Sequence, residues 1–245
     1  MKIATYNICH CGNYENWKEG EELPVNIAHT AQMIAEINAD IIGLNAVYTI
    51  GDREDFCLQE EKLAKLAGYP YYVFAKGKEF EWATIGNAIL SKYPILKVEK
   101  IAVPAPSEEE RNPNEKNWYE DRVLLCVEIE VDGKNVCVIS SHFGLNPTEK
   151  RNIVKEVCKV IEGRENVVLM GDFNMLPDNE ILSPLYARLK SVAKEQENNE
   201  YTFASYEPKF QIDYIFVSKN TKIQSYTVYK NIVSDHRPIS AEIEL

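Results

Sequence analysis

Residues 166–174 read Asn-Val-Val-Leu-Met-Gly-Asp-Phe-Asn, and this stretch decides how the rest of the chain can be arranged. Its four apolar residues, Val-Val-Leu-Met, are typical of a strand buried on both faces. Gly171 ends the run, and Asp172 and Asn174 come after it, two residues apart, so an extended chain would carry both side chains on one side. A carboxylate beside a carboxamide at a strand end offers a base or metal ligand with a neutral hydrogen-bonding partner. A polar turn is the alternative interpretation, because all three residue types are common turn formers.

Length and composition indicate an ordinary soluble globular protein. The chain has 245 residues, 45% hydrophobic and 27% charged, and no shift of composition marks a boundary, so a single domain over residues 1–245 is expected. The net charge is −11 with no cluster of lysine and arginine. This charge disfavours a nucleic-acid partner, because affinity for nucleic acid depends largely on neutralising its phosphates. The chain turns polar by position 7 and has no long apolar run, so neither a signal peptide nor a membrane span is expected.

The cysteines favour a reducing compartment. Six are spread along the chain without a Cys-x-x-Cys pair or a zinc-like histidine spacing, at Cys9, Cys11, Cys57, Cys126, Cys137 and Cys158. Buried free thiols in the cytoplasm are therefore expected. Cys9 and Cys11 share one face of an extended segment, and a metal or redox role for them is the less favoured alternative.

The pattern of apolar residues predicts an α/β domain with largely antiparallel sheets. Strands are expected at 2–8, 41–47, 71–75, 84–91, 95–103, 123–131, 136–141, 167–172, 211–217, 222–229 and 239–244. Helices are expected at 25–38, from about 55 to 68, at 147–163 and around 181–189, and residues 191–200 are expected to be solvated. Residues 104–117 hold three prolines and a run of glutamates, which predicts a long exposed loop of the kind that is often functional.

Polar side chains recur where these strands end. They are Asn7, His142, Asp172, Asn174, Asp213, Asp235 and His236. Asp213 lies inside the otherwise apolar strand expected at 211–217, where a charge is costly without a partner. Each residue alone has a structural interpretation, but their number predicts one site, because substrates bind where strand ends gather.

Several segments resemble the endonuclease/exonuclease/phosphatase superfamily, which has the DNase I-like fold. They are Thr-Tyr-Asn (5–7), Gly-Asn-Ala-Ile-Leu-Ser-Lys-Tyr-Pro-Ile (86–95), Ser-His-Phe (141–143), Gly-Asp-Phe-Asn (171–174), Ile-Asp-Tyr-Ile-Phe (212–216) and Ser-Asp-His-Arg-Pro (234–238). The opening Asn-Ile-Cys-His-Cys-Gly is similar to small bacterial members. The resemblance implies a four-layer α/β sandwich, with two mostly antiparallel central sheets flanked by helices. It also implies hydrolysis of phosphoester bonds with Mg²⁺ or Mn²⁺.

The residue types suit that chemistry, since a phosphoester is anionic and its attack needs charge compensation and an aligned water. Asp172 is expected to be the base and Asn174 to hydrogen-bond the phosphate or the nucleophile. His236 is expected to stabilise the transition state, with Asp213 holding it protonated and oriented. The remaining expected roles are a second phosphate-contacting imidazole or leaving-group acid for His142, metal contacts for Asn7 and Asp235, and a pocket border for Tyr119 and Arg122.

One position departs from the family pattern. The family's second strand usually ends Gly-Leu-Gln-Glu-Val, with the glutamate as principal metal ligand, whereas residues 43–47 here read Gly-Leu-Asn-Ala-Val. Ala46 has no donor atom, and Asn45 is not expected to replace it because adjacent strand residues point to opposite faces. Three interpretations stay open: weak metal binding, a nearby carboxylate or water in the gap, or a disabled form.

The function expected from these features is metal-dependent hydrolysis of a small-molecule or lipid-headgroup phosphoester, as phosphodiesterase or phosphatase, by a cytoplasmic monomer. Two alternatives remain. A phosphoester-binding protein without activity would explain the loss at position 46. A DNA or RNA nuclease would fit the family resemblance, although the acidic net charge counts against it.

Overall fold

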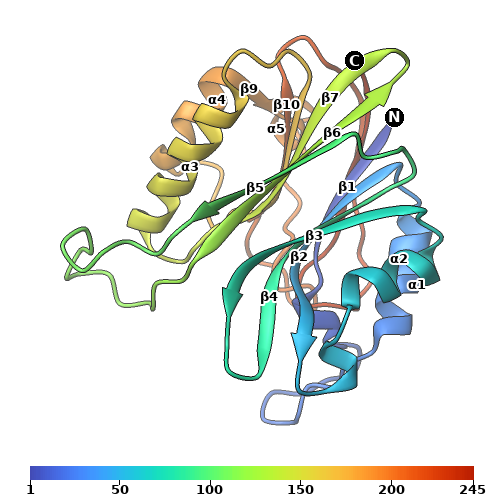
Figure 1. Cartoon of the computed structure of the whole chain (residues 1–245), viewed down its shortest axis with the longest axis vertical. Helices are drawn as coiled ribbons and strands as arrows, with labels where there is room; N and C mark the ends of the chain where they lie inside the picture. The colour runs from blue at the N-terminus through green and yellow to red at the C-terminus, as the bar shows by residue number, and fades with distance from the viewer.

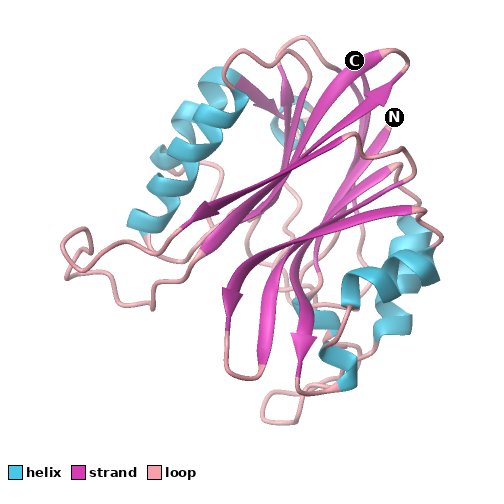
Figure 2. Ribbon diagram, viewed as in Figure 1, coloured by secondary structure: helices cyan, strands magenta, loops and turns pink.

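Two six-stranded β-sheets pack face to face at the centre of the protein (Figures 1 and 2). The computed structural model describes all 245 residues. The first sheet contains β1 (Lys2–Asn7), β2 (Ile41–Gly51), β3 (Tyr71–Glu79), β4 (Ala83–Ser91), β11 (Lys222–Val228) and β12 (Ile239–Glu244). Its strand order is β11-β12-β1-β2-β4-β3, and only β1 and β2 run parallel.

The second sheet repeats this plan with later segments of the chain. It contains β5 (Lys97–Val103), β6 (Arg122–Val131), β7 (Lys134–His142), β8 (Val167–Asp172), β9 (Leu189–Ser191) and β10 (Asp213–Ser218). Its order is β5-β6-β7-β8-β10-β9, and only β7 and β8 are parallel. Both sheets are therefore mostly antiparallel, as the sequence predicted.

Helices cover the outer face of each sheet, which completes the four layers. In Figure 1, α1 (Ile27–Ile37) and α2 (Gln59–Ala67) lie outside the first sheet, and α3 (Pro147–Ile161) and α4 (Ser183–Arg188) lie outside the second. Short elements are η1 (Cys9–Cys11), η2 (Glu54–Phe56), η3 (Glu180–Leu182) and α5 (Val192–Glu195). No helix combines the length and apolar character needed to cross a bilayer.

Three apolar clusters match the three interfaces between layers. The cluster between the sheets includes Ile41, Val168 and Met170, and those under the helices include Ile34 and Val157. The continuous apolar run of β8 results from this placement, because its two faces are buried in different clusters. One sequence prediction was wrong: Val192, expected in a solvated segment, is fully buried in the cluster between the sheets.

Strand register gathers the polar strand ends at one edge of the sandwich. In the parallel pairs, Asn7 lies opposite Asn45, and His142 lies opposite Asp172. The antiparallel pairing of β10 with β8 then places Asp213 opposite Asp172 as well. Side chains far apart in the sequence therefore meet between the two sheets.

Gly171 permits the close pairing of β7 with β8. Its φ is +146°, and an added Cβ would overlap the carbonyl oxygen of Ser141. The glycine is required both by its backbone conformation and by the absence of space.

We expect Gly171→Ala to lower the free energy of unfolding by about 2–4 kcal/mol, because strand pairing and backbone conformation are both disturbed. Gly133→Ala is the matched control, since φ there is +76° but the space around it is open. Its cost should be about 1–2 kcal/mol, from backbone conformation alone. Urea unfolding of both variants measures the difference. Equal losses would contradict the role given to the Ser141 contact.

Candidate functional site

A cleft of about 320 Å³ opens where the polar strand ends meet. Its lining includes most of the side chains expected from the sequence, namely Asn7, Arg122, His142, Asp172, Asn174 and His236. A larger hollow of about 1120 Å³ lies between α3 and α4 and contains none of them. The smaller cleft is therefore where the chemistry is concentrated.

Asp172 lies at the centre of the cleft's hydrogen bonds. Its Oδ2 accepts from Asn7 Nδ2 at 3.0 Å and lies 3.3 Å from His142 Nε2, while its Oδ1 accepts from the backbone N–H of Asn174 at 2.9 Å. Burial opposes ionisation, but the charge of His236 and the bond to His142 outweigh it and hold the pKa of Asp172 well below its usual range. This side chain is therefore a carboxylate at neutral pH.

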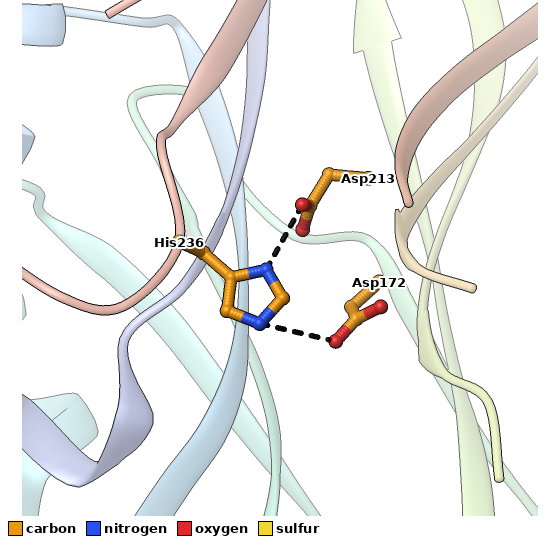
Figure 3. Close-up of side chains that lie close together, drawn as sticks. All are labelled: Asp172, Asp213 and His236. Carbon is orange, nitrogen blue, oxygen red and sulfur yellow. Dashed lines mark hydrogen bonds and ion pairs between the residues drawn. The ribbon is translucent and has the colours of Figure 1, made fainter. Parts of the chain in front are cut away.

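His236 is held between two carboxylates (Figure 3). Its Nδ1 lies 2.9 Å from Asp213 Oδ2, and its Nε2 lies 3.6 Å from Asp172 Oδ2. Burial alone would lower its pKa, but Asp213 and Asp172 raise it to about 10. Burial, reinforced by the charge of Asp172, raises the pKa of Asp213 against the effect of His236. At neutral pH His236 is therefore a buried cation.

The turn after β8 differs from the extended chain expected from the sequence. Asn174 has φ +51°, and its side chain donates to the carbonyl of Phe143 at 3.0 Å. Its backbone N–H, rather than its side chain, contacts Asp172. Asn174 still lines the cleft, but it also closes the turn that fixes the carboxylate.

Two buried amides connect this site to both sheets, and the sequence reasoning missed them. Asn45 Oδ1 accepts from the backbone N–H of Asp172 at 3.0 Å, and its Nδ2 donates to Asn87 Oδ1 at 2.9 Å. Asn87 Nδ2 in turn donates to the carbonyl of Val123. Buried asparagines within apolar strands were the available signal, because buried amides need partners.

Ala46 lies in a β-bulge, where strand alternation does not apply. Leu44 pairs with Ala88 and Val47 with Gly86, so two residues of β2 lie opposite one residue of β4. Within this bulge Ala46 has a φ of +55°. Asn45 continues the alternation of Ile41 and Gly43, which face the second sheet, and it therefore reaches Asp172.

The two side chains expected to contact a metal lie beside Cys9. Asn7 Oδ1 accepts from the Cys9 N–H at 3.1 Å, and burial together with the charge of Asp235 raises the pKa of Cys9 to about 12. Asp235 accepts from the Ser234 hydroxyl and does not line the cleft. Separately, ligand atoms of Asp172, Asp213 and His236 lie within 4.8 Å of one another and form a group that could hold a metal ion. A doubly protonated imidazole has no lone pair to donate, so this group is a poor metal site while His236 is charged.

The cleft border contains one of the two residues expected there. Arg122 lines it and donates to Glu120 at 2.9 Å, as Lys78 also does. Tyr119 is not part of the lining, because its hydroxyl donates to Glu115 in the long loop.

The base of that loop, residues 104–121, is fixed at both ends. Ala105 N–H donates to Asp121 Oδ1, and Glu120 N–H donates to Glu149, the carboxylate of the capping box at the start of α3. These bonds hold the rim that carries Arg122.

An aromatic wall that the sequence did not indicate adjoins this rim, since Lys78 donates to Glu120 and lies over the ring of Phe80. Tyr48 and Phe80 line the cleft. Tyr48 stacks on His10 at 5.0 Å and meets Trp82 edge to face at 5.5 Å. Trp82, 41% exposed, also stacks on Phe80. Such a wall offers contact surface to a ring or apolar group of a ligand.

Two facing mixed sheets, flanking helices and a buried Asp–His pair at the strand ends define a DNase I-like fold. The family model described as the endonuclease/exonuclease/phosphatase family matches residues 4–236, and the chain belongs to this family. YbhP from Escherichia coli is 25% identical over 230 residues, covering 86% of each chain.

Solved structures support the same fold. An endonuclease/exonuclease/phosphatase from Beutenbergia cavernae is similar with a TM-score of 0.80 and 22% identity, covering 100% of this chain and 71% of that one. A mannosyl-6-phosphatase from Bacteroides thetaiotaomicron has a TM-score of 0.73 and 16% identity over 100% of both chains. The fold expectation from the sequence is confirmed.

The raised pKa of His236 predicts how stability changes with pH. A group whose pKa in the folded protein lies above its ordinary value stabilises the fold fully at pH values below the ordinary pKa. It loses this effect as the pH rises through the folded-state pKa. Between pH 6.5 and about 10 the free energy of unfolding should therefore fall, by at most about 1.4 kcal/mol per pH unit from this group. Urea unfolding across the window measures it. Asp213→Asn should flatten the slope, and an unchanged slope would contradict the charge on His236.

Proposed function

We propose that this protein is a metal-dependent phosphoester hydrolase acting through the cleft between the two sheets. The observation that carries the proposal is the buried line of Asp213, His236 and Asp172, which presents a cation and a carboxylate side by side in the cleft. A phosphoryl group in transfer gathers negative charge, which such a cation stabilises, while a carboxylate orients the attacking water.

Each cleft residue has a part in this proposal. Asp172 aligns the water and accepts its proton, and Asn7 and Asn174 keep the carboxylate in place. His236 offsets charge developing on the phosphoryl oxygens, and Asp213 is the positioning residue that keeps it charged. His142, on the other side of Asp172, contacts the phosphate or protonates the leaving group, and Arg122 binds the anionic substrate at the rim.

The donor atoms fit a divalent ion only in part. Asn7 and Asp235 would hold Mg²⁺ or Mn²⁺ beside Cys9, and waters and substrate phosphate would complete a shell of the kind Mg²⁺ prefers. When bound, the ion would offset charge on the phosphoryl oxygens. Ala46 adds no oxygen, so we expect weak binding.

The substrate we favour is a small phosphorylated molecule or a lipid headgroup. The cleft volume of about 320 Å³ suits a compact ligand. The likeness to a mannosyl-6-phosphatase agrees with a substrate of this size. The net charge of −11 disfavours a nuclease. The six free cysteines fit a cytoplasmic location, and we propose a single-domain monomer. A non-catalytic phosphoester-binding protein is the second candidate, favoured by Ala46 alone.

We expect Asp172→Asn to reduce hydrolysis of a nitrophenyl phosphodiester in Mg²⁺ by about 10²-fold or more, because the variant keeps the size of the side chain but loses the base. The matched control is Asp178→Asn, an exposed aspartate in the loop after the same strand, which should leave turnover unchanged. If the wild type hydrolyses the substrate and Asp172→Asn does so at the same rate, another group is the base. A wild type that shows no turnover with or without metal would favour the binding protein.

We expect Ala46→Glu to raise Mg²⁺ affinity, because it places a hard anionic oxygen where the family's second strand usually carries its metal-ligand glutamate. The control is Ala46→Gln, which has the same shape without the charge and tests the effect of filling the bulge. Calorimetric Mg²⁺ titration of all three forms gives the answer without relying on activity. A gain only in the glutamate variant supports the metal position, whereas equal affinities would place the ion elsewhere.

A further inference from the structure

Two cysteines on neighbouring strands bring their sulfur atoms together. The Sγ atoms of Cys126 on β6 and Cys137 on β7 lie 3.2 Å apart. Their positions are diagonal across the antiparallel pair, since Cys126 lies opposite Ile139 and Cys137 opposite Glu128. Both belong to the cluster between the second sheet and α3. Buried free thiols were expected at these positions, and the structure brings two of them within hydrogen-bonding distance.

Arg164 places a cation over the pair. Its Nη1 donates to Cys137 Sγ at 3.0 Å and to Cys126 Sγ at 3.5 Å. Its Nη2 donates to Glu99 at 3.0 Å, and Glu128 is 3.5 Å from Nη1, so the guanidinium is held on several sides. Contacts from two strands therefore keep the cation against the sulfur of Cys137.

The two sulfurs differ in their access to solvent. Cys137 is 5% exposed and, with Arg164, lines a surface hollow of about 470 Å³. Cys126 is fully buried. A small reagent that enters the hollow therefore meets Cys137 first, with Cys126 behind it.

The same contacts shift the pKa values of the two thiols in opposite directions. The bond from Cys126, together with Arg164, lowers the pKa of Cys137 although burial opposes this. The shared bond and burial raise the pKa of Cys126, which stays protonated. Elsewhere in the chain, burial raises the pKa of Cys9, Cys11 and Cys158. Because the thiolate is the nucleophile, Cys137 is the more reactive sulfur.

We propose that Cys137 and Cys126 form a dithiol site for small hydroperoxides, with Cys137 as the attacking sulfur and Cys126 as the resolving one. The Cys137 thiolate attacks the terminal oxygen of ROOH, which forms an S–O bond, breaks the O–O bond and releases RO⁻, protonated by water. Cys126 then attacks the resulting sulfenic acid. A disulfide forms, and the thiol proton leaves with the hydroxyl as water. The sum is two thiols and ROOH giving one disulfide, ROH and water, which a thiol reductant reverses.

The geometry allows the second step with a small displacement. A disulfide has an S–S length of about 2.05 Å, so the sulfurs must approach by about 1 Å. The site also lies apart from the cleft, since Cys137 pairs with Val167 at the start of β8 and His142 with Asp172 at its end. The proposal is therefore independent of the phosphoester chemistry.

The test treats the reduced full-length protein with hydrogen peroxide, then blocks free thiols and maps peptides by mass spectrometry. We expect one linkage, Cys126 to Cys137, with loss of two hydrogens and full recovery with dithiothreitol. Cys126→Ser should stop at a Cys137 sulfenic acid that dimedone traps. Arg164→Gln should slow alkylation of Cys137 by about tenfold near neutral pH, as a rise of one pKa unit would.

Cys158, half-buried and without a neighbouring sulfur, is the internal reference. Arg164→Lys keeps the charge and separates an electrostatic effect from disturbed folding, so it should react faster than Arg164→Gln. The proposal would be overturned if Cys137 were modified no faster than Cys158, or if disulfides other than Cys126 to Cys137 formed. Equal rates of Cys137 alkylation in both Arg164 variants would also overturn it.

Discussion

The site depends on one buried interaction, the bond between His236 and Asp213 beside a second carboxylate. Isolated charges at this depth are costly, and the pair is stable only because each charge has a partner and a hydrogen bond. Asp172 gains from the same cation. Both carboxylates favour the charge of His236 and it favours theirs, whereas Asp172 disfavours the charge of Asp213. Removing His236 would leave both buried carboxylates without this cation.

The two parallel strand pairs explain why these groups meet. Parallel neighbours carry their carboxyl ends to the same edge, which brings Asn7 and Asn45 from one sheet towards His142 and Asp172 from the other. The bond from Asp172 N–H to Asn45 then joins the sheets directly. The site is thus part of the contact between the two layers and not an addition to its surface.

Regular periodicity made much of the fold and of the cleft predictable from the sequence. Apolar runs located β8 and most other strands, and the polar residues that ended them identified most of the cleft lining. Features that depend on irregular backbone or distant contacts could not be predicted in this way. The bulge gives Ala46 a φ of +55°, and Tyr119 donates to Glu115 instead of lining the cleft. The aromatic wall combines Tyr48 of β2 with Phe80 and Trp82 of the turn between β3 and β4, which no local pattern reveals.

The fixed base of the 104–121 loop has an evolutionary consequence. Because Asp121 and Glu149 hold its ends, changes in length or composition between them need not displace Arg122. Surface loops tolerate insertions well, since closing a longer loop adds little entropy cost. Related proteins can therefore diversify this segment and acquire new ligand preferences while the position of Arg122 is kept.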